Sequence, residues 1–343
     1  MFDVVTIGSV TRDAFFGASS FPMISDPGTP SRKGFLLPLG GKLDVEDVFF
    51  TIGGNAANAS VTFSRQKFYT ACAGKIGNDV AGEEALRRLK KEKVATRFIS
   101  VSETLPTAYS VLLMKNGERT ILGYHGAANE FSINDLRLKK LRAKWWYVSL
   151  SGESEKMYRP LIAHAKREGI AVAVNPSGYQ LAHRRDEILK SLKDISLLVL
   201  NEEEAALLTG IPFSREREVF QKLDALTSPG ILVVTNGKGG VTVSDGHRVY
   251  HAETFKEKKL ADRTGAGDAF GSGFVAGLLR HKITGRNLET VTETHIKEAI
   301  RCASANATSV VEHVGATEGI LTKKEAQLPR FKRLKITVAH TGQ

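Results

Sequence analysis

A glycine-rich turn in the last third of the chain combines an anion-binding backbone with a carboxylate. It covers residues 262–268, reads Asp-Arg-Thr-Gly-Ala-Gly-Asp, and is followed by small and apolar residues typical of a buried helix. The N-terminus of such a helix presents free N–H groups and the positive end of the helix dipole to an anion. Because a carboxylate repels a bound phosphate, the presence of Asp268 in this turn requires an explanation.

General-base catalysis supplies one explanation. Asp268 could take the proton of an attacking hydroxyl, while the backbone amides of residues 265–267 (Gly265, Ala266 and Gly267) hold a transferring phosphoryl group. The alternative is that Asp268 only complements the positive end of the helix dipole. The turn taken alone does not decide between the two interpretations.

A second candidate segment lies at residues 53–58, which read Gly-Gly-Asn-Ala-Ala-Asn. A Gly-Gly pair ahead of a helix permits close contact between backbone and ligand, and Asn58 falls one turn into that helix. An Asn side chain both donates and accepts hydrogen bonds, which suits sugar hydroxyls. By itself the segment is more typical of a turn before an Ala-rich packing helix, so its interpretation depends on the other motifs.

Other well-known site motifs are absent from the sequence. Gly237-Lys238-Gly239 lacks the Ser or Thr that follows the lysine of a phosphate-binding Walker loop. The turn after the first strand has one glycine, Gly8, where a dinucleotide fingerprint needs three. Neither the zinc-protease pattern His-Glu-x-x-His nor the hydrolase pattern Gly-x-Ser-x-Gly occurs.

Short apolar strands alternate with amphipathic helices along the chain, which predicts an α/β fold with a central, mostly parallel sheet flanked by helices. The expected strands are Val4–Gly8, Tyr69–Ala73, Trp145–Leu150, Ala171–Asn175, Leu197–Leu200 and Ile231–Thr235. The expected helices include Ala56–Ser64, Ala81–Lys91, Glu153–Glu168, Glu202–Leu208 and Arg215–Leu226. Ligands of such sheets bind at the carboxyl ends of the strands, where the glycine-rich segments are expected.

Two stretches interrupt this alternation, at about 32–52 and 96–124. Both show polar alternation and turns, and Asn116-Gly117 is a strong hairpin signal. We expect them to form a small sheet outside the main domain, which covers a site as a lid. The main domain is expected to span residues 1–320, and the basic tail at 321–343 receives no role.

The charge and cysteine content favour a small anionic ligand and a reducing compartment. The 48 Lys and Arg residues exceed the 37 Asp and Glu, but they are spread along the chain without a block of basic and aromatic residues. This distribution does not favour nucleic-acid binding, whereas ATP would suit it. The two cysteines have no metal-ligand spacing, and no leader or membrane-spanning run is visible, so we predict a soluble cytoplasmic protein.

Taken together, three elements in this order resemble the PfkB/ribokinase family of carbohydrate and nucleoside kinases. They are Gly-Gly-x-x-x-Asn at 53–58, Asn-Glu-x-Glu at 201–204 and Gly-Ala-Gly-Asp at 265–268, and the resemblance covers about residues 1–320. It implies a ribokinase-like fold with a small β-sheet lid. It also implies an ATP-dependent transfer of a phosphoryl group to a hydroxyl of a small sugar. In some members the lid forms a dimer interface, which would make this chain a homodimer.

The resemblance also implies roles for individual residues. Asp268 matches the catalytic base, and residues 265–267 match the anion hole. The acceptor would be bound by three residues from the N-terminal part of the chain, namely Asp13, Gly54 and Asn58.

Further positions match the nucleotide and cation sites of the family. Asn201 and Glu204 match the element that organises Mg²⁺ and phosphate, generally through water. Three residues match positions that contact the nucleotide, with Asn306 beside the adenine: Thr235, Gly237 and Asn306. Three others match positions around a monovalent-cation site, which implies K⁺: Asp262, Thr264 and Gly315.

The identity of the acceptor stays open. This chain has Arg263 where family members usually carry Thr, and Asn55 where ribokinase itself has Lys. Aromatic residues of the first half could form a wall for a nucleoside base, and basic residues there could bind a phosphosugar. A catalytically silent binding module is the alternative from another functional class, and the intact Gly-Ala-Gly-Asp element argues against it.

Overall fold

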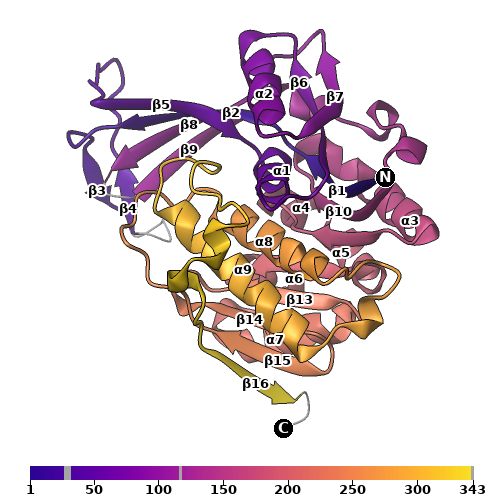
Figure 1. Ribbon diagram of the computed structural model, residues 1–343. Helices are drawn as coiled ribbons and strands as arrows, with labels where there is room; N and C mark the ends of the chain where they lie inside the picture. The colour runs from indigo at the N-terminus through magenta and orange to yellow at the C-terminus, as the bar shows by residue number, and fades with distance from the viewer. Residues whose placement is uncertain (27–31, 116–117, 341–343) are drawn as a thin grey trace.

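A sheet of ten strands forms the centre of the protein in the computed structural model, which describes residues 1–26, 32–115 and 118–340 (Figure 1). Its strands follow the order β16-β15-β14-β13-β12-β11-β10-β1-β6-β7. The seven strands from β13 to β7 pair in parallel, whereas β14, β15 and β16 extend the sheet in antiparallel fashion. In chain order the strands are β1 (Phe2–Gly8), β6 (Thr70–Gly77), β7 (Ala95–Ser102), β10 (Ala143–Ser149), β11 (Ala171–Val174), β12 (Leu197–Asn201), β13 (Ile231–Thr235), β14 (Val241–Ser244), β15 (Arg248–Ala252) and β16 (Ile336–His340).

Helices cover both faces of this sheet, as the sequence predicts. One face packs against α1 (Asn55–Arg65), α8 (Ala266–Arg280) and α9 (Glu293–Val311). The other face packs against α3 (Tyr158–Glu168), α4 (Gly178–His183), α5 (Arg185–Ser191), α6 (Glu202–Thr209) and α7 (Glu216–Thr227). Neighbouring residues of one strand point to opposite faces, so Trp145 and Trp146 are both fully buried in different core clusters.

A second, smaller sheet, which we call the lid, projects beyond the main sheet at the upper left of Figure 1. Its order is β5-β2-β8-β9, with β2 (Thr11–Gly17), β5 (Asp47–Gly53), β8 (Ala108–Lys115) and β9 (Glu118–Tyr124). The predicted hairpin is confirmed by the antiparallel pairing of β8 with β9. The Asn116-Gly117 turn itself lies outside the described residues.

The predicted bounds of the lid are wrong in three places. Residues 95–102 form β7 of the main sheet, and their polar alternation arises because β7 is an edge strand that leaves much of its length half-exposed. The lid also contains β2, which follows β1 after only two residues and was not predicted. Between residues 32 and 46 the described strand is β4 (Lys33–Phe35), which pairs with β3 (Met23–Ser25) in a separate small sheet.

The segment predicted as a tail belongs to the fold. Within it, β16 pairs antiparallel with β15 at the edge of the main sheet. Because its residues are half-exposed or exposed, no run of buried apolar residues marks this strand in the sequence. None of the helices in the described residues combines the length and the apolar character needed to cross a lipid bilayer.

The lid is attached to the main domain at the N-terminus of α2 (Val80–Lys91). The Asp79 side chain accepts a hydrogen bond from the Gly82 N–H at 2.8 Å and so caps this helix. It also accepts hydrogen bonds from the backbone N–H and the hydroxyl of Thr107, at 2.7 and 2.6 Å, directly before β8. One carboxylate therefore satisfies a helix end and fixes the start of a lid strand.

We expect Asp79→Ala to lower the free energy of unfolding by about 1–3 kcal/mol, because it removes a helix cap and leaves the donors of the buried Thr107 unpaired. Urea unfolding of the full chain measures this. Glu83→Ala, an exposed change in the same helical turn, is the matched control and should stay within about 0.5 kcal/mol of wild type. Equal effects of the two substitutions would contradict the assignment.

Candidate active site

The glycine-rich turn ends where α8 begins, at the carboxyl edge of the parallel strands. Gly265 has a left-handed backbone with φ of 78°, and a Cβ there would lie 2.5 Å from the Cβ of Ala316. Only glycine fits this turn, for both reasons. Gly267 is exposed at the first turn of α8, while the Ala266 N–H makes a long 3.3 Å bond to the Arg263 carbonyl.

Asp268 lies in the first turn of α8 and is half-buried. The Asn58 Nδ2 of α1 donates a hydrogen bond to Asp268 Oδ2 at 2.9 Å. Burial raises the pKa of Asp268 to about 6, although the Asn58 bond acts to lower it, and the charge of Asp13 adds to the rise. A carboxylate with this pKa is ionised at neutral pH and accepts a proton far more readily than an exposed aspartate does.

Asn58 and Asp13 form a polar site next to Asp268. The Asn58 Oδ1 is buried and has no hydrogen-bond partner among the described residues. Asp13, on β2 of the lid, is 5% exposed and accepts a bond from the Thr11 hydroxyl at 2.8 Å. Burial raises the pKa of Asp13, against the lowering effect of hydrogen bonds from Thr11 and Ser110. These buried acceptors are of the kind that a ligand hydroxyl satisfies.

The Gly-Gly pair makes room for this polar site. A Cβ at Gly53 would lie 1.9 Å from the Asp13 Oδ2, so a larger residue would displace the carboxylate. Gly54 has φ of 90°, and a Cβ there would lie 2.5 Å from the Ser9 carbonyl oxygen. The structure thus brings together the predicted acceptor-site residues of β2, the β5–α1 turn and α1.

Asp262 anchors the start of the glycine-rich turn. It is fully buried, and its Oδ1 accepts hydrogen bonds from the Thr264 N–H and hydroxyl at 2.9 and 2.8 Å. Its Oδ2 accepts a 3.3 Å bond from the Gly315 N–H. The three residues predicted around a monovalent cation are therefore in direct contact.

A cavity of about 320 Å³ opens beside the turn, and Asp13 is not among its lining residues. Asn201, Thr235 and Gly237 line it together with Ala266 and Gly267. The other lining residues are both apolar and polar, namely Phe255, Leu260, Phe270, Ser304, Ala307, Thr308 and Val311, and Lys238, Gly240, Glu253, Thr254, Glu257 and Arg263. A cavity that combines a glycine-rich turn with several apolar side chains suits a phosphate chain attached to a flat base.

Asn201 and Glu204 form a reciprocal capping box at the start of α6. The Asn201 Oδ1 accepts from the Glu204 N–H at 2.8 Å, and the Glu204 Oε2 accepts from the Asn201 N–H at 2.9 Å. Burial raises the pKa of Glu204, the bond from Asn201 lowers it, and the charge of Asp268 raises it further. Glu204 is therefore close enough to Asp268 for the two charges to interact.

The predicted position of Asn306 beside a nucleotide base is wrong. Asn306 is 1% exposed, and it does not line the cavity. Its Nδ2 donates to the Ala269 carbonyl and the Thr62 hydroxyl, and its Oδ1 accepts from the Leu321 N–H. The side chain joins α9 to α8, α1 and the chain after α9. On a helix, one residue of shift turns a side chain by about 100°, and Ala307 and Thr308 face the cavity instead.

Three polar residues near the site had no role assigned from the sequence. Arg263, whose role stayed open, and Lys238 both line the cavity, and only their position in the two glycine-rich turns could have indicated it. The Tyr147 hydroxyl on β10 is buried without a partner among the described residues. Burial raises the pKa of Tyr147 well above its usual range, and the charges of Asp268 and Glu204 contribute. No sequence pattern distinguishes this tyrosine from a core residue.

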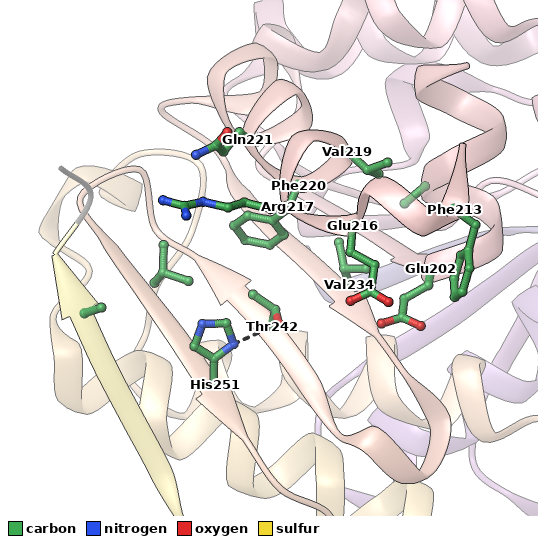
Figure 2. A pocket seen from close by; sticks show the side chains of 13 residues that line it. Glu202, Phe213, Glu216, Arg217, Val219, Phe220, Gln221, Val234, Thr242 and His251 are labelled. Atoms are coloured by element: carbon green, nitrogen blue, oxygen red, sulfur yellow. Dashed lines mark hydrogen bonds between the residues drawn. The ribbon is translucent and has the colours of Figure 1, made fainter. Parts of the chain in front are cut away.

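A larger cavity of about 420 Å³ lies on the opposite face of the main sheet, between α7 and strands β13 to β15 (Figure 2). Phe213, Phe220 and Val234 contribute apolar walls, and Figure 2 shows the carboxylates of Glu202 and Glu216 side by side. It contains none of the predicted site residues. The smaller cavity beside α8 is therefore the candidate active site.

We expect Asp268→Asn to stabilise the fold more at pH 8 than at pH 4.5, by about 2 kcal/mol. The folded pKa, about 6, exceeds the ordinary value of 3.8, so the protonated acid favours the fold and this contribution is lost as the pH rises through 6. The neutral Asn avoids that loss. Urea unfolding of variant and wild type at both pH values measures it, and an equal difference at the two pH values would contradict the raised pKa.

Known proteins resemble this chain over most of its length. A ribokinase from Haemophilus influenzae is 28% identical over 328 residues, which cover 94% of this chain and 96% of the relative. A structure of Arabidopsis thaliana ribokinase complexed with ribose and ATP superposes with a TM-score of 0.75 at 20% identity, over 97% of this chain and 99% of that one. A Burkholderia thailandensis nucleoside kinase in complex with inosine gives a TM-score of 0.72 at 17% identity, over 96% and 97% of the two chains.

These similarities confirm the ribokinase-like fold. The family description "pfkB family carbohydrate kinase" matches residues 31–323, which include the Gly-Gly, Asn-Glu-x-Glu and Gly-Ala-Gly-Asp elements. The chain therefore belongs to the pfkB family of carbohydrate kinases.

Proposed function

We propose that this kinase transfers the γ-phosphoryl group of ATP to a hydroxyl of a small sugar, with Asp268 as the general base. The observation that carries the proposal is the position of Asp268. It bonds to Asn58 of the polar site, and the Ala266 and Gly267 that precede it line the nucleotide-sized cavity. A carboxylate with a pKa of about 6 at the junction of two such sites suits deprotonation of an alcohol.

Phosphoryl transfer requires only ATP and the acceptor hydroxyl as reactants. Asp268 takes the proton of the acceptor hydroxyl as the hydroxyl oxygen forms a bond to the γ-phosphorus. The bond from the γ-phosphorus to the oxygen bridging it to the β-phosphate breaks, and ADP leaves. The glycine-lined first turn of α8 and its dipole stabilise the negative charge on the transferring group.

The acceptor occupies the polar site between the lid and α1. A sugar hydroxyl donates to the unpartnered Asn58 Oδ1, and another donates to Asp13. Gly54 leaves space for the sugar next to the backbone. A polyol satisfies both acceptors with one molecule, which supports a sugar as the acceptor.

The residues present fit a magnesium ion held mainly by the nucleotide. The described residues contain no group of three His, Cys, Asp or Glu side chains that could enclose a metal. Mg²⁺ keeps several waters and needs few carboxylates, so Glu204 and Asn201 suffice to orient those waters. When bound, the ion neutralises the phosphate charge. The apolar lining residues, which include Phe255 and residues of α9, support a place for the nucleotide base in this cavity.

We expect ADP release from ATP only when an acceptor alcohol is present, in a coupled assay over free sugars, sugar phosphates and nucleosides. Asp268→Asn should lower kcat by about 100- to 10,000-fold, because the variant cannot take the proton. Wild-type activity should fall as the pH drops below about 6, since Asp268 is then protonated.

The matched control is Glu83→Gln, an exposed change in α2 outside the proposed site, which should leave kcat unchanged. Wild-type turnover in Asp268→Asn would contradict the base assignment. Preference for nucleosides or sugar phosphates in the screen would replace the free sugar as acceptor, but not the phosphoryl-transfer chemistry.

A K⁺ ion beside Asp262 is a further part of the proposal. Asp262 is buried without a basic partner among the described residues, and Thr264 and Gly315 supply the neighbouring backbone. A monovalent cation there would neutralise the carboxylate and hold the turn that precedes Gly265.

Replacing Na⁺ by K⁺ at constant ionic strength should therefore raise kcat several-fold, roughly 3- to 10-fold. The coupled assay with the preferred acceptor measures it, with tetramethylammonium as the inert reference cation. Equal rates in all three salts would remove the K⁺ site from the proposal.

A further inference from the structure

The loop Gly315–Glu318 touches both halves of the proposed active site. On one side, a Cβ at Gly315 would lie 3.1 Å from the Phe49 ring and 3.3 Å from the Thr51 methyl group, so the loop packs directly on lid strand β5. On the other side, the Gly315 N–H bonds to Asp262, and Ala316 packs against Gly265. The loop is therefore the physical contact between the lid and the glycine-rich turn.

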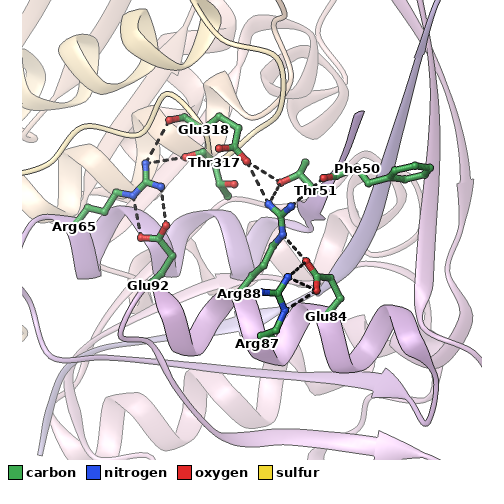
Figure 3. A network of polar contacts seen from close by, with 9 residues as sticks. All are labelled: Phe50, Thr51, Arg65, Glu84, Arg87, Arg88, Glu92, Thr317 and Glu318. Atoms are coloured by element: carbon green, nitrogen blue, oxygen red, sulfur yellow. Dashed lines mark hydrogen bonds and ion pairs between the residues drawn. The ribbon is translucent and has the colours of Figure 1, made fainter. Parts of the chain in front are cut away.

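Arg88 of α2 binds the lid strand and this loop at the same time (Figure 3). Its guanidinium donates to the Thr51 hydroxyl at 3.1 Å, to the Phe50 carbonyl at 3.1 Å and to Glu318 Oε1 at 3.4 Å. Its Nε donates to Glu84 at 2.8 Å, which fixes the guanidinium plane on α2. The Thr51 hydroxyl also donates to Glu318 Oε1 at 3.1 Å. We call the three residues Arg88, Thr51 and Glu318 the clasp.

Arg65 of α1 holds the same loop from the main domain, next to the clasp in Figure 3. It donates to the carbonyls of Thr317 and Ile320 at 2.9 and 2.8 Å and forms an ion pair with Glu92. The loop is thus tied firmly to α1, so a displacement of β5 must either break the clasp or move the loop. Because Thr51 pairs with Asp13 across β5 and β2, the strand that the clasp holds also positions the acceptor-site carboxylate.

We infer that the clasp couples the nucleotide site to the acceptor site. Nucleotide bound at the first turn of α8 orders lid strand β5 through the loop 315–318, and Arg88 is the residue that positions β5 against this loop. The inference rests on the proposed function. Phosphate bound at Gly265–Gly267 restrains the turn. The contacts of Asp262 with Gly315 and of Gly265 with Ala316 extend this restraint to the loop. By linkage, acceptor binding under the lid then strengthens nucleotide binding by the same factor. Such coupling would align the hydroxyl and the phosphoryl group before transfer.

The test is hydrogen–deuterium exchange of the full chain, with and without saturating Mg²⁺ and AMPPNP, the β,γ-imido analogue of ATP. Two peptides are compared, one over residues 47–53 of β5 and one over 262–268 of the turn, with α7 (216–227) as internal reference. In the wild type, AMPPNP should slow exchange of both peptides by about 5-fold or more. In Arg88→Gln it should protect the turn as before and the lid strand by less than about 2-fold.

Arg87→Gln is the matched control. Arg87 is the adjacent residue of α2 and bonds to the same Glu84, but among the described residues its side chain reaches neither β5 nor the loop. It should behave as wild type. Thr51→Val keeps the shape of the buried side chain and removes only the hydroxyl, so it repeats the test if Arg88→Gln folds poorly.

The outcomes separate this inference from the proposed function. Protection of 262–268 without 47–53 in the wild type, or unchanged protection of 47–53 in both clasp variants, would overturn the coupling and leave the kinase proposal intact. No protection of 262–268 in the wild type would overturn both. Loss of lid protection in Arg88→Gln and Thr51→Val, but not in Arg87→Gln, supports the clasp.

Discussion

The active site depends on keeping a carboxylate at the mouth of α8, where burial disfavours its charge. Asp268 interacts with two further half-buried or buried acids, Asp13 and Glu204, and burial raises the pKa of all three. Like charges in low dielectric repel strongly, so the arrangement survives only because the N-terminus of α8 and the Asn58 amide stabilise the negative charge. The same opposition raises the pKa of Asp268 and suits it to its proposed role as base, because a carboxylate that is poorly solvated binds a proton more tightly.

Glycines allow the separate chain segments to approach this carboxylate. Gly53 leaves space for the Asp13 carboxylate because it has no side chain, and Gly265 permits Ala316 to pack against the turn. Neither contact tolerates a Cβ, since a Cβ at either glycine would lie well inside van der Waals distance of its neighbour. Strands β12 and β13 end at the same edge of the sheet, and the last residue of each therefore lines the cavity. The geometry of the site is therefore set by backbone packing, and the polar side chains are placed upon it.

In the proposed reaction both sheets contribute residues, and this division gives the connecting loop the role that we infer for it. The acceptor-site Asp13 belongs to the lid, whereas Asp268 belongs to the main domain. In the proposed reaction, a movement of one sheet relative to the other changes the distance between the attacking hydroxyl and the base. We infer that contacts across this boundary, such as those of Arg88 with Thr51 and Glu318, hold that distance. Their strength comes from geometry, because Arg88 can satisfy four acceptors at once with a planar guanidinium.

The amino-acid sequence by itself determined the alternation of strands and helices, the three glycine- and asparagine-bearing elements and hence the family, because these depend on local period and local turn chemistry. Only the tertiary structure decided that residues 95–102 join the main sheet and that β2 joins the lid, since strand partners are chosen by non-local packing. It also turned Asn306 inward, where three hydrogen bonds fix it, and exposed Ala307 and Thr308 to the cavity instead. No local sequence pattern marks the apolar walls of the cavity, Tyr147 or the clasp. The residues that they contact lie tens to hundreds of positions away along the chain.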